Sequence, residues 1–269
     1  MLAIPFERGR RRVRFTGAVV SELAEIRARL GWKHLLRGQF QHLLLVLVLM
    51  PGALYLVEPH LGGQFIGPMR HRQAAHGLVA VAVTHQVTAW LVWRLQLCFG
   101  LLSRLLGKWD LAVWGVVFFP FLGARVALLA LVGLGDSGSL GLGRPVEVGM
   151  GVVLLLIAGY TLWSVLWGFG LVRAMGGDHF RERYRRMPLV ETGIFRYSSN
   201  AMYTFGFGGL WGLGLLLGSP AALVLALFQH AYIWVHMYCT EQPDMEVLYG
   251  DRPEPSSQQL GGGGGCNSV

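Results

Sequence analysis

Long apolar stretches dominate this chain of 269 residues and limit what it can fold into. Several of them reach the roughly 20 residues that a helix needs to cross the hydrocarbon core of a bilayer. Only 14% of the residues are charged, whereas an average soluble domain has about 25%. The sequence therefore predicts an all-α protein, a polytopic membrane bundle of about six spans. These spans are expected at about 40–57, 75–99, 111–134, 148–172, 201–217 and 220–238.

The regions around these spans suggest four segments. Residues 1–38 are basic, and from Val19 to Leu36 they are amphipathic, typical of either a solvated helix or a helix lying on anionic lipid. Residues 39–147 hold the N-terminal membrane helices, and residues 148–250 form a second membrane core. The Gly-rich tail 251–269 is expected to be disordered.

The last two apolar stretches are separated by a short break that contains Gly218, Ser219 and Pro220. Glycine commonly follows a helix end, serine caps a helix start and proline suits a first turn, so a tight C-terminal helical hairpin is expected. Most Lys and Arg residues lie in segments 1–39, 104–108 and 173–196. Because cytoplasmic loops carry an excess of these residues, both termini are expected in the cytoplasm. The net charge of +8 is explained by this topology and does not indicate a nucleic-acid partner.

The histidines and cysteines do not form a metal-binding pattern. None of the nine histidines is three or four residues from another, the spacing that helical metal pairs need. The three cysteines are scattered and match neither a disulfide framework nor a zinc motif. The sequence predicts no metal site.

Arg125 is a charged residue well inside an apolar stretch. A charge at that depth costs at least about 2.5–3.5 kcal/mol, so its side chain should face a partner or a wet cavity. Glu147 is one candidate partner.

Polar segments flank the last two apolar stretches, and any chemistry is expected there. In the first, Gly193 permits a turn, Arg196 supplies a cation, and Asn200 is one of three possible N-caps for a helix that begins at Ala201. Such a helix start beside an arginine could hold a carboxylate or a phosphate. Ordinary helix capping is the alternative interpretation.

The second polar segment is acidic, with Glu241, Asp244 and Glu246 close together and no basic residue among them. These carboxylates could hold an ammonium group. The two segments together could bind a zwitterionic small molecule, and a solvated acidic helix end is the alternative.

Gly168 and Gly170 lie at the end of the span predicted at 148–172. They could let a flat ligand approach the backbone closely, or they could serve helix packing. If Gly170 lies in a helix, its replacement by alanine should favour the helix by about 1 kcal/mol.

The segment 192–203, TGIFRYSSNAMY, resembles the G-x-[YF]-R-x-x-[RD]-[HN]-P-x-Y signature of integral-membrane methyltransferases. That family includes phospholipid (phosphatidylethanolamine) N-methyltransferases and isoprenylcysteine carboxyl methyltransferases. The segment that begins with Glu241 and ends at Gly250 is similar to the family's E-E-x element before a terminal F/Y-G. Residues 168–170 are similar to the G-x-G of the phospholipid branch. The chain departs from the family at Ala201, where proline is usual, and at Gln242, where a second glutamate is usual.

The resemblance implies that S-adenosylmethionine donates a methyl group to a membrane lipid amine, phosphatidylethanolamine or its methylated derivatives. It implies a methyltransferase-like core at 148–250, with the donor at the cytoplasmic ends of the last helices. A base, Glu246 or His236, would take the proton from the amine. The residues expected to bind the donor are Gly168, Gly170, Arg196, Asn200, Tyr203 and Glu241.

A membrane lipid is the expected partner, and the bacterial inner membrane or the endoplasmic reticulum is the expected location. The oligomeric state stays open. Two alternatives also stay open: a methyltransferase for a prenyl-cysteine carboxylate or a small thiol, and a non-catalytic membrane binding protein with a degenerate donor pocket.

Overall fold

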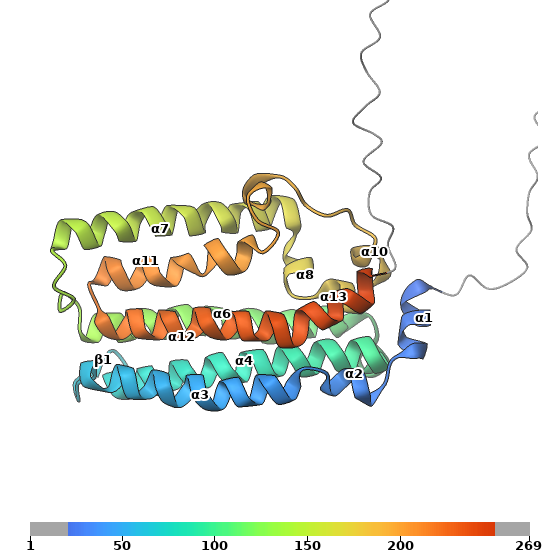
Figure 1. Ribbon diagram of the computed structural model, residues 1–269, viewed down its shortest axis with the longest axis horizontal. Coiled ribbons are helices and arrows are strands. Elements are labelled where there is room, and N and C mark those ends of the chain that lie inside the picture. The colour runs from blue at the N-terminus through green and yellow to red at the C-terminus, as the bar shows by residue number, and fades with distance from the viewer. Residues whose placement is uncertain (1–20, 251–269) are drawn as a thin grey trace, which may run out of the picture.

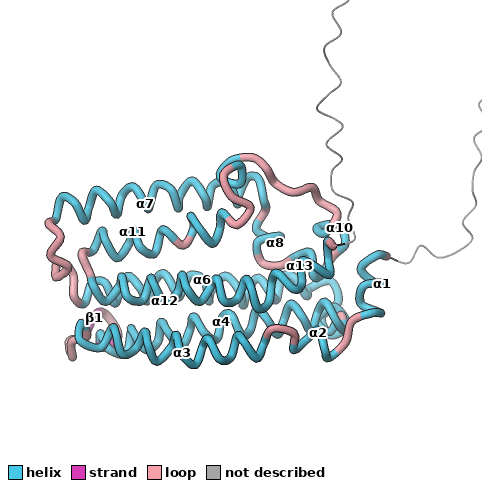
Figure 2. The backbone as a smooth tube through the Cα atoms, in the orientation of Figure 1, coloured by secondary structure: helices cyan, strands magenta, loops and turns pink. Residues whose placement is uncertain are grey.

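The computed structural model describes residues 21–250 as a bundle of long helices that run side by side (Figure 1). Five helices are long and apolar enough to cross a membrane, which confirms the helical membrane architecture. A sixth apolar helix, Met202–Leu217, is shorter than the others. Helices make up most of the tube in Figure 2. The basic segment before residue 21 and the predicted tail 251–269 lie outside the described residues.

The long helices form the body of the bundle, and short elements gather at its two ends (Figure 1). The long helices are α3 (Gln39–Val57), α4 (His71–Phe99), α6 (Asp110–Gly135), α7 (Arg144–Ser164) and α12 (Pro220–His236), and the shorter α11 (Gly208–Leu217) lies among them. The short helices are α1 (Glu22–Arg29), α2 (Trp32–Leu36), α5 (Leu101–Leu106), α8 (Leu171–Ala174), α9 (Gly177–Phe180), α10 (Glu182–Arg185) and α13 (Gln242–Tyr249). Strands β1 (Phe65–Ile66) and β2 (Met69–Arg70) pair antiparallel, Phe65 opposite Arg70.

Tighter and wider helical turns join several of these elements. The 3-10 turns are η1 (Glu58–His60), η2 (Gly107–Trp109) and η4 (Gly193–Arg196). The π-helical turns are η3 (Val165–Phe169), η5 (Met202–Gly206) and η6 (Met237–Glu241).

Two predictions about the helices are wrong. The amphipathic segment forms two short helices, α1 and α2, rather than one. The last span does not end near residue 238 but continues through η6 and α13 to Tyr249. Pro243 does not stop it, because this proline lies in the first turn of α13, where its backbone nitrogen needs no hydrogen-bond partner.

The core lies between α3, α4, α6 and α12, where small and branched side chains such as Ala82, Leu129 and Leu225 are fully buried. Helices α7 and α11 come into close contact at two glycines. A Cβ atom on Gly151 would lie 2.9 Å from the carbonyl oxygen of Gly212, so these helices pack backbone to backbone. Because α7 and α11 run side by side, η3, which follows α7, and η5, which precedes α11, lie at the same end of the bundle (Figure 1).

The break between α11 and α12 has the predicted capping. Gly218 takes a left-handed conformation with φ +63°, and the Ser219 hydroxyl accepts a hydrogen bond of 2.9 Å from the backbone N–H of Ala222. The carboxylate of Asp136 accepts a hydrogen bond of 2.9 Å from the backbone N–H of Ala221.

Arg125 does not pair with Glu147. Its Nε donates to the Oε1 of Gln229 on α12 at 2.8 Å, and its guanidinium lies 5.3 Å from the centre of the Phe207 ring. Glu147 instead lies 3.5 Å from Arg144. Since Arg125 is 2% exposed, it does not snorkel to the membrane surface, and Gln229 and the Phe207 ring are the groups that its guanidinium contacts. One of its terminal nitrogens has no hydrogen-bond partner among the described residues.

A buried polar network ties the C-terminal helix to the N-terminal half. Asp244 of α13 is fully buried, and its Oδ1 accepts hydrogen bonds from Nε2 of His34 at 2.8 Å and Nε of Arg94 at 3.0 Å. Its Oδ2 lies 3.3 Å from Nε2 of His179. The other ring nitrogen of His179 lies 2.9 Å from Oδ1 of Asp178. The Asp178 side chain also accepts a hydrogen bond of 2.8 Å from the Tyr249 hydroxyl.

His179 lies between two carboxylates, outside the spanning helices. Burial alone would lower its pKa, but the hydrogen bonds and charges of Asp178 and Asp244 raise it to about 10. The same ion pair outweighs burial at Asp178 and holds the pKa of that carboxyl below its ordinary value. Both ring nitrogens of His179 therefore donate, and the imidazolium joins α9 to α13.

The charge of His179 should make the stability of the protein depend on pH. Its folded-state pKa, about 10, is higher than its ordinary value of 6.5. The stabilisation is therefore complete below pH 6.5 and is lost as the pH rises towards 10. We expect the unfolding temperature, followed by tryptophan fluorescence in detergent, to fall over this range. His179→Gln should flatten that dependence, whereas the exposed control His60→Gln should keep it. Identical slopes for all three proteins would contradict a charged His179.

Candidate functional site

Three π-helical turns coincide with the three polar or glycine-containing segments that the sequence singled out. Turn η3 contains Gly168, η5 contains Tyr203 and η6 ends at Glu241. All three turns lie towards the end of the bundle that carries α8, α10 and α13 (Figure 1). A π-helical turn inserts an extra residue into a helix and often occurs at functional sites.

Tyr203 and Glu241 are in direct contact, although 38 residues separate them in the chain. The Tyr203 hydroxyl donates a hydrogen bond to Oε2 of Glu241. The edge of the Tyr203 ring meets Trp234, with the ring centres 6.0 Å apart. This contact joins η5 to η6 and orients the carboxylate of Glu241.

Glu241 is the one member of the acidic cluster that has no cationic partner among residues 21–250. Asp244 is bound by His34, Arg94 and His179, and Glu246 forms an ion pair of 2.7 Å with Arg37. Of the three carboxylates that could hold an ammonium group, Asp244 and Glu246 are therefore already paired within the protein. Their partners come from distant parts of the chain, which the local sequence does not reveal.

The glycines of η3 differ from each other. A Cβ on Gly168 would make ordinary contacts, 3.6 Å from Cγ1 of Val190 and 3.9 Å from Oγ1 of Thr192. Gly170 has φ +90°, and a Cβ there would meet nothing within 4 Å among the described residues. Gly170 ends the π-helical turn and is not in mid-helix, so the expectation that alanine would favour a helix there is wrong. Alanine at this φ would be strained.

The segment 192–203 packs against η3. Gly193 has φ +61°, and a Cβ there would lie 2.6 Å from Oγ of Ser164. That same Oγ accepts a hydrogen bond of 3.1 Å from the backbone N–H of Ile194. The rings of Phe169 and Phe195 stack with centres 5.3 Å apart. A glycine is thus required where this segment meets the end of α7.

Arg196 and Asn200 have side chains available for a ligand. Arg196 is exposed and makes no ion pair within the described part of the chain. The backbone N–H of Asn200 donates to Oγ of Ser198 at 3.1 Å. No side chain caps the helix that begins at Ala201, so the predicted N-cap is not formed.

The two candidate bases lie in different surroundings. Glu246 is half-exposed in its pair with Arg37. His236 is buried beside Trp93 and His42, with ring centres 5.4 and 6.3 Å away, and its ring nitrogens have no hydrogen-bond partner among the described residues. No hydrogen bond within residues 21–250 links either side chain to Tyr203 or Glu241.

Sequence reasoning missed Asp178 and His179, which belong to the buried network around Asp244. They follow Gly176, where φ is +84° and a Cβ would lie 2.4 Å from Nε1 of Trp93. The charges of Asp178 and His179 are close enough to act on Glu241. An adjacent Asp-His pair directly after two glycines is the signal that could have found them.

The described residues hold no group of three or more His, Cys, Asp or Glu side chains that could bind a metal ion.

Comparison with known proteins finds similarity in the C-terminal segment. Residues 146–252 match the family model for phospholipid methyltransferases. The phosphatidylethanolamine N-methyltransferase of Yarrowia lipolytica is 32% identical over 106 residues, which cover 39% of this chain and 11% of that protein. The proteins of the same name from Malassezia globosa and Laccaria bicolor are each 34% identical, over 38% and 36% of this chain. No solved structure matches the chain.

The matched segment contains Gly168, Tyr203 and Glu241 and ends just after α13. The chain spans only about a tenth of the length of these curated relatives, since the matches cover 10–11% of them. Within residues 146–252, the resemblance to phospholipid methyltransferases that the three sequence motifs predicted is confirmed.

Proposed function

We propose that this protein transfers a methyl group from S-adenosylmethionine to the amine of a membrane phospholipid, phosphatidylethanolamine or a methylated derivative. The observation that carries the proposal is the contact between Tyr203 and Glu241 inside the segment that matches phospholipid methyltransferases. The membrane helices support a substrate that reaches the site from the bilayer.

The residues of the site fit such a donor. Glu241 is a partly buried carboxylate whose hydrogen bond comes from a neutral hydroxyl, so it can bind an ammonium group. The open space beside Gly170 suits a flat adenosyl group, and Gly168, Arg196 and Asn200 lie in the same matched segment. When bound, the donor supplies an activated methyl group on a sulfonium. The protein then has to hold the acceptor nitrogen in line with that methyl.

The acceptor amine must lose its proton before it can react. His236 has two ring nitrogens without a described partner, whereas Glu246 is held by Arg37. Both remain candidates for the base, and His236 has the less engaged side chain.

The two departures from the family pattern leave the site intact. Ala201 is fully buried beside Val165, Ile194 and Phe195, so the residue that replaces proline packs well. Gln242 is exposed at the start of α13, whereas Glu241 is bound to Tyr203. The carboxylate that contacts Tyr203 is the one that the chain retains.

In the proposed topology the chain crosses the membrane six times, and the shorter helix Met202–Leu217 is the fifth crossing. The site then lies at the cytoplasmic face of the bacterial inner membrane or the endoplasmic reticulum. A cysteine introduced at position 142 should be labelled only from the far side, and one at position 184 only from the cytoplasm. Labelling of both from one side by a membrane-impermeant maleimide would overturn this orientation.

Glu241→Gln should weaken donor binding more than tenfold and abolish most methyl transfer, because the charge-assisted contact to the ammonium is lost. Purified protein in nanodiscs that contain phosphatidylethanolamine would be given donor with a labelled methyl group, and chromatography of the lipids would follow the label. Calorimetry would measure donor affinity. Glutamine can still accept the hydrogen bond from Tyr203, so the unfolding temperature should stay near that of the wild type. The exposed control Glu191→Gln should behave as wild type.

The outcomes separate the alternatives. Labelled phospholipid supports the proposal. If only a prenylated cysteine peptide or a small thiol is labelled, that molecule and not the phospholipid is the acceptor. Donor binding without any turnover would identify a non-catalytic binding protein. Wild-type donor affinity in Glu241→Gln would remove this residue from the site.

Gly168→Ala tests whether η3 borders the donor. The added methyl group would make only ordinary contacts with Val190 and Thr192, so stability should not fall. If the adenosyl group lies against η3, donor affinity should drop at least fivefold. Gly159→Ala on α7, where a Cβ would meet nothing within 4 Å, is the matched control and should keep full affinity. If the Gly168→Ala protein is stable and fully active, Gly168 serves helix packing and does not border the donor.

A further inference from the structure

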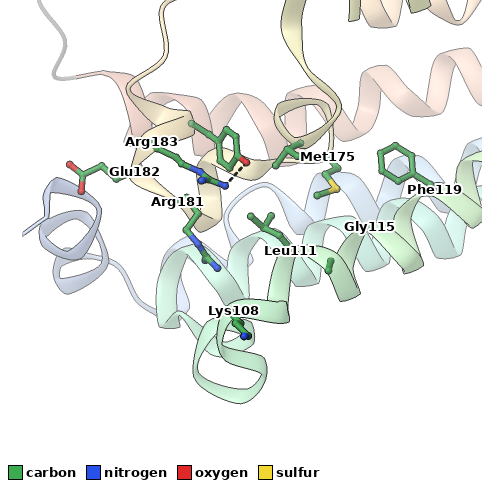
Figure 3. Close-up of a pocket in the computed structure, with 11 residues that line it drawn as sticks. Lys108, Leu111, Gly115, Phe119, Met175, Arg181, Glu182 and Arg183 are labelled. Carbon is green, nitrogen blue, oxygen red and sulfur yellow. Dashed lines mark hydrogen bonds between the residues drawn. The ribbon is translucent and has the colours of Figure 1, made fainter. Parts of the chain in front are cut away.

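A groove lies between α6 and the segment α8–α10, and the mechanism above does not use it. Its volume is about 710 Å³, within the roughly 300–1,000 Å³ of typical ligand pockets. Figure 3 shows Leu111, Gly115 and Phe119 along one wall and Met175 and Arg183 on the other. We call it the α6 groove.

The α6 groove changes from charged to apolar along its length. Lys108 stands at its mouth, next to Trp109, which is 63% exposed. Tryptophan at this exposure is typical of the interface between lipid and water. From Lys108 to Phe119 the chain rises about 16 Å at 1.5 Å per residue, roughly half the hydrocarbon thickness. A polar mouth at the interface with an apolar floor below it matches an amphiphile that stands upright in one leaflet.

Two of the cations at the groove are not neutralised by carboxylates within the described residues. Arg181 donates two hydrogen bonds, of 2.7 and 2.6 Å, to the carboxylate of Asp110. Lys108 instead lies 5.5 Å from the centre of the Trp109 ring, and Arg183 donates to the Tyr184 hydroxyl at 2.7 Å. Lys108 and Arg183 therefore supply two positive charges that a phosphate diester could neutralise.

Met175 lines the α6 groove and lies a few residues before Asp178 and His179 in the chain. The carbonyl oxygen of Met175 accepts hydrogen bonds from Nε1 of Trp93 at 2.9 Å and Nε1 of Trp114 at 2.8 Å, which fix its position. Three and four residues later come Asp178 and His179, whose charges act on Glu241. One short segment thus carries a lining residue of the groove and two charged side chains that act on Glu241.

We propose that the α6 groove binds the acceptor phospholipid, with its phosphate at Lys108 and Arg183 and an acyl chain along Leu111, Gly115 and Phe119. This inference rests on the proposed function, because it assigns the lipid in the groove as the methyl acceptor. The positive charges fix the phosphate, and the headgroup amine extends from it towards the segment that carries Asp178 and His179.

Gly115→Leu is the sharpest test of the apolar floor. A Cβ at this position would lie 3.5 Å from Sδ of Met175 and 3.8 Å from Cε2 of Phe119, so a leucine side chain would fill the groove. Gly123→Leu on the same helix is the matched control, because a Cβ there meets nothing within 4 Å. Phosphatidylethanolamine with a photoreactive acyl chain should label residues 108–119 or 172–184 in the wild type and in Gly123→Leu. Gly115→Leu should lose at least four-fifths of that labelling.

Kinetics in nanodiscs test the charged mouth and the role as acceptor site. The double variant Lys108→Ala, Arg183→Ala should raise the apparent KM for phosphatidylethanolamine at least fivefold. Donor affinity, measured by calorimetry, should stay unchanged in this variant and in Gly115→Leu, which also shows that both proteins remain folded.

Labelling that Gly115→Leu leaves unchanged, or labelling confined to other residues, would overturn the proposal. An unchanged KM in both variants would overturn the acceptor role. If the wild type is labelled in the groove but methylates no lipid, the proposed function fails while the groove remains a phospholipid site.

Discussion

The buried pair of Arg94 and Asp244 is the constraint on which the C-terminal end of the bundle depends. Both side chains are fully buried, so each charge is satisfied only by groups of the protein. Removing one partner of such a pair typically costs about 3–5 kcal/mol, because the other charge is left stranded. The nitrogens of Arg94 also donate to the carbonyl oxygens of His34 and Leu35 at the end of α2. Helices from both halves of the chain are thereby fastened at the level of the candidate site.

Arg94 also explains the position of Glu241. One of its terminal nitrogens donates to the carbonyl oxygens of Cys239 and Thr240, each at 3.1 Å, within η6. A π-helical turn contains an extra residue, so the side chains that follow it are rotated relative to a regular α-helix. Asp244 then faces inward to Arg94, while Glu241 meets Tyr203. The same buried arginine thus supports both the wide turn and the orientation of the carboxylate that it presents.

The sequence predicted the helices well because a spanning helix is specified by a local run of apolar residues. It also predicted the capping at Ser219, and its motifs picked out Tyr203 and Glu241. It could not predict the partners of Asp244, which lie 210, 150 and 65 residues away in the chain. Nor could it show that Gly170 has φ +90°. The sequence around a glycine near a helix end does not reveal whether that glycine packs against another helix, forms a turn or leaves room for a ligand. The partners of Asp244 depend on long-range pairing, and the role of Gly170 depends on its backbone conformation.

The matched segment does not contain every group that acts on the site. Residues 146–252 carry Tyr203, Glu241 and the glycines of η3, whereas Arg94 and Lys108 lie outside them. The segment similar to phospholipid methyltransferases thus supplies the donor side of the proposed reaction. The N-terminal helices supply the charge that holds α13 in place and one wall of the α6 groove. We expect changes in those helices to alter which lipid is accepted without altering donor binding, because these helices line the groove, whereas Tyr203 and Glu241 lie in the matched segment.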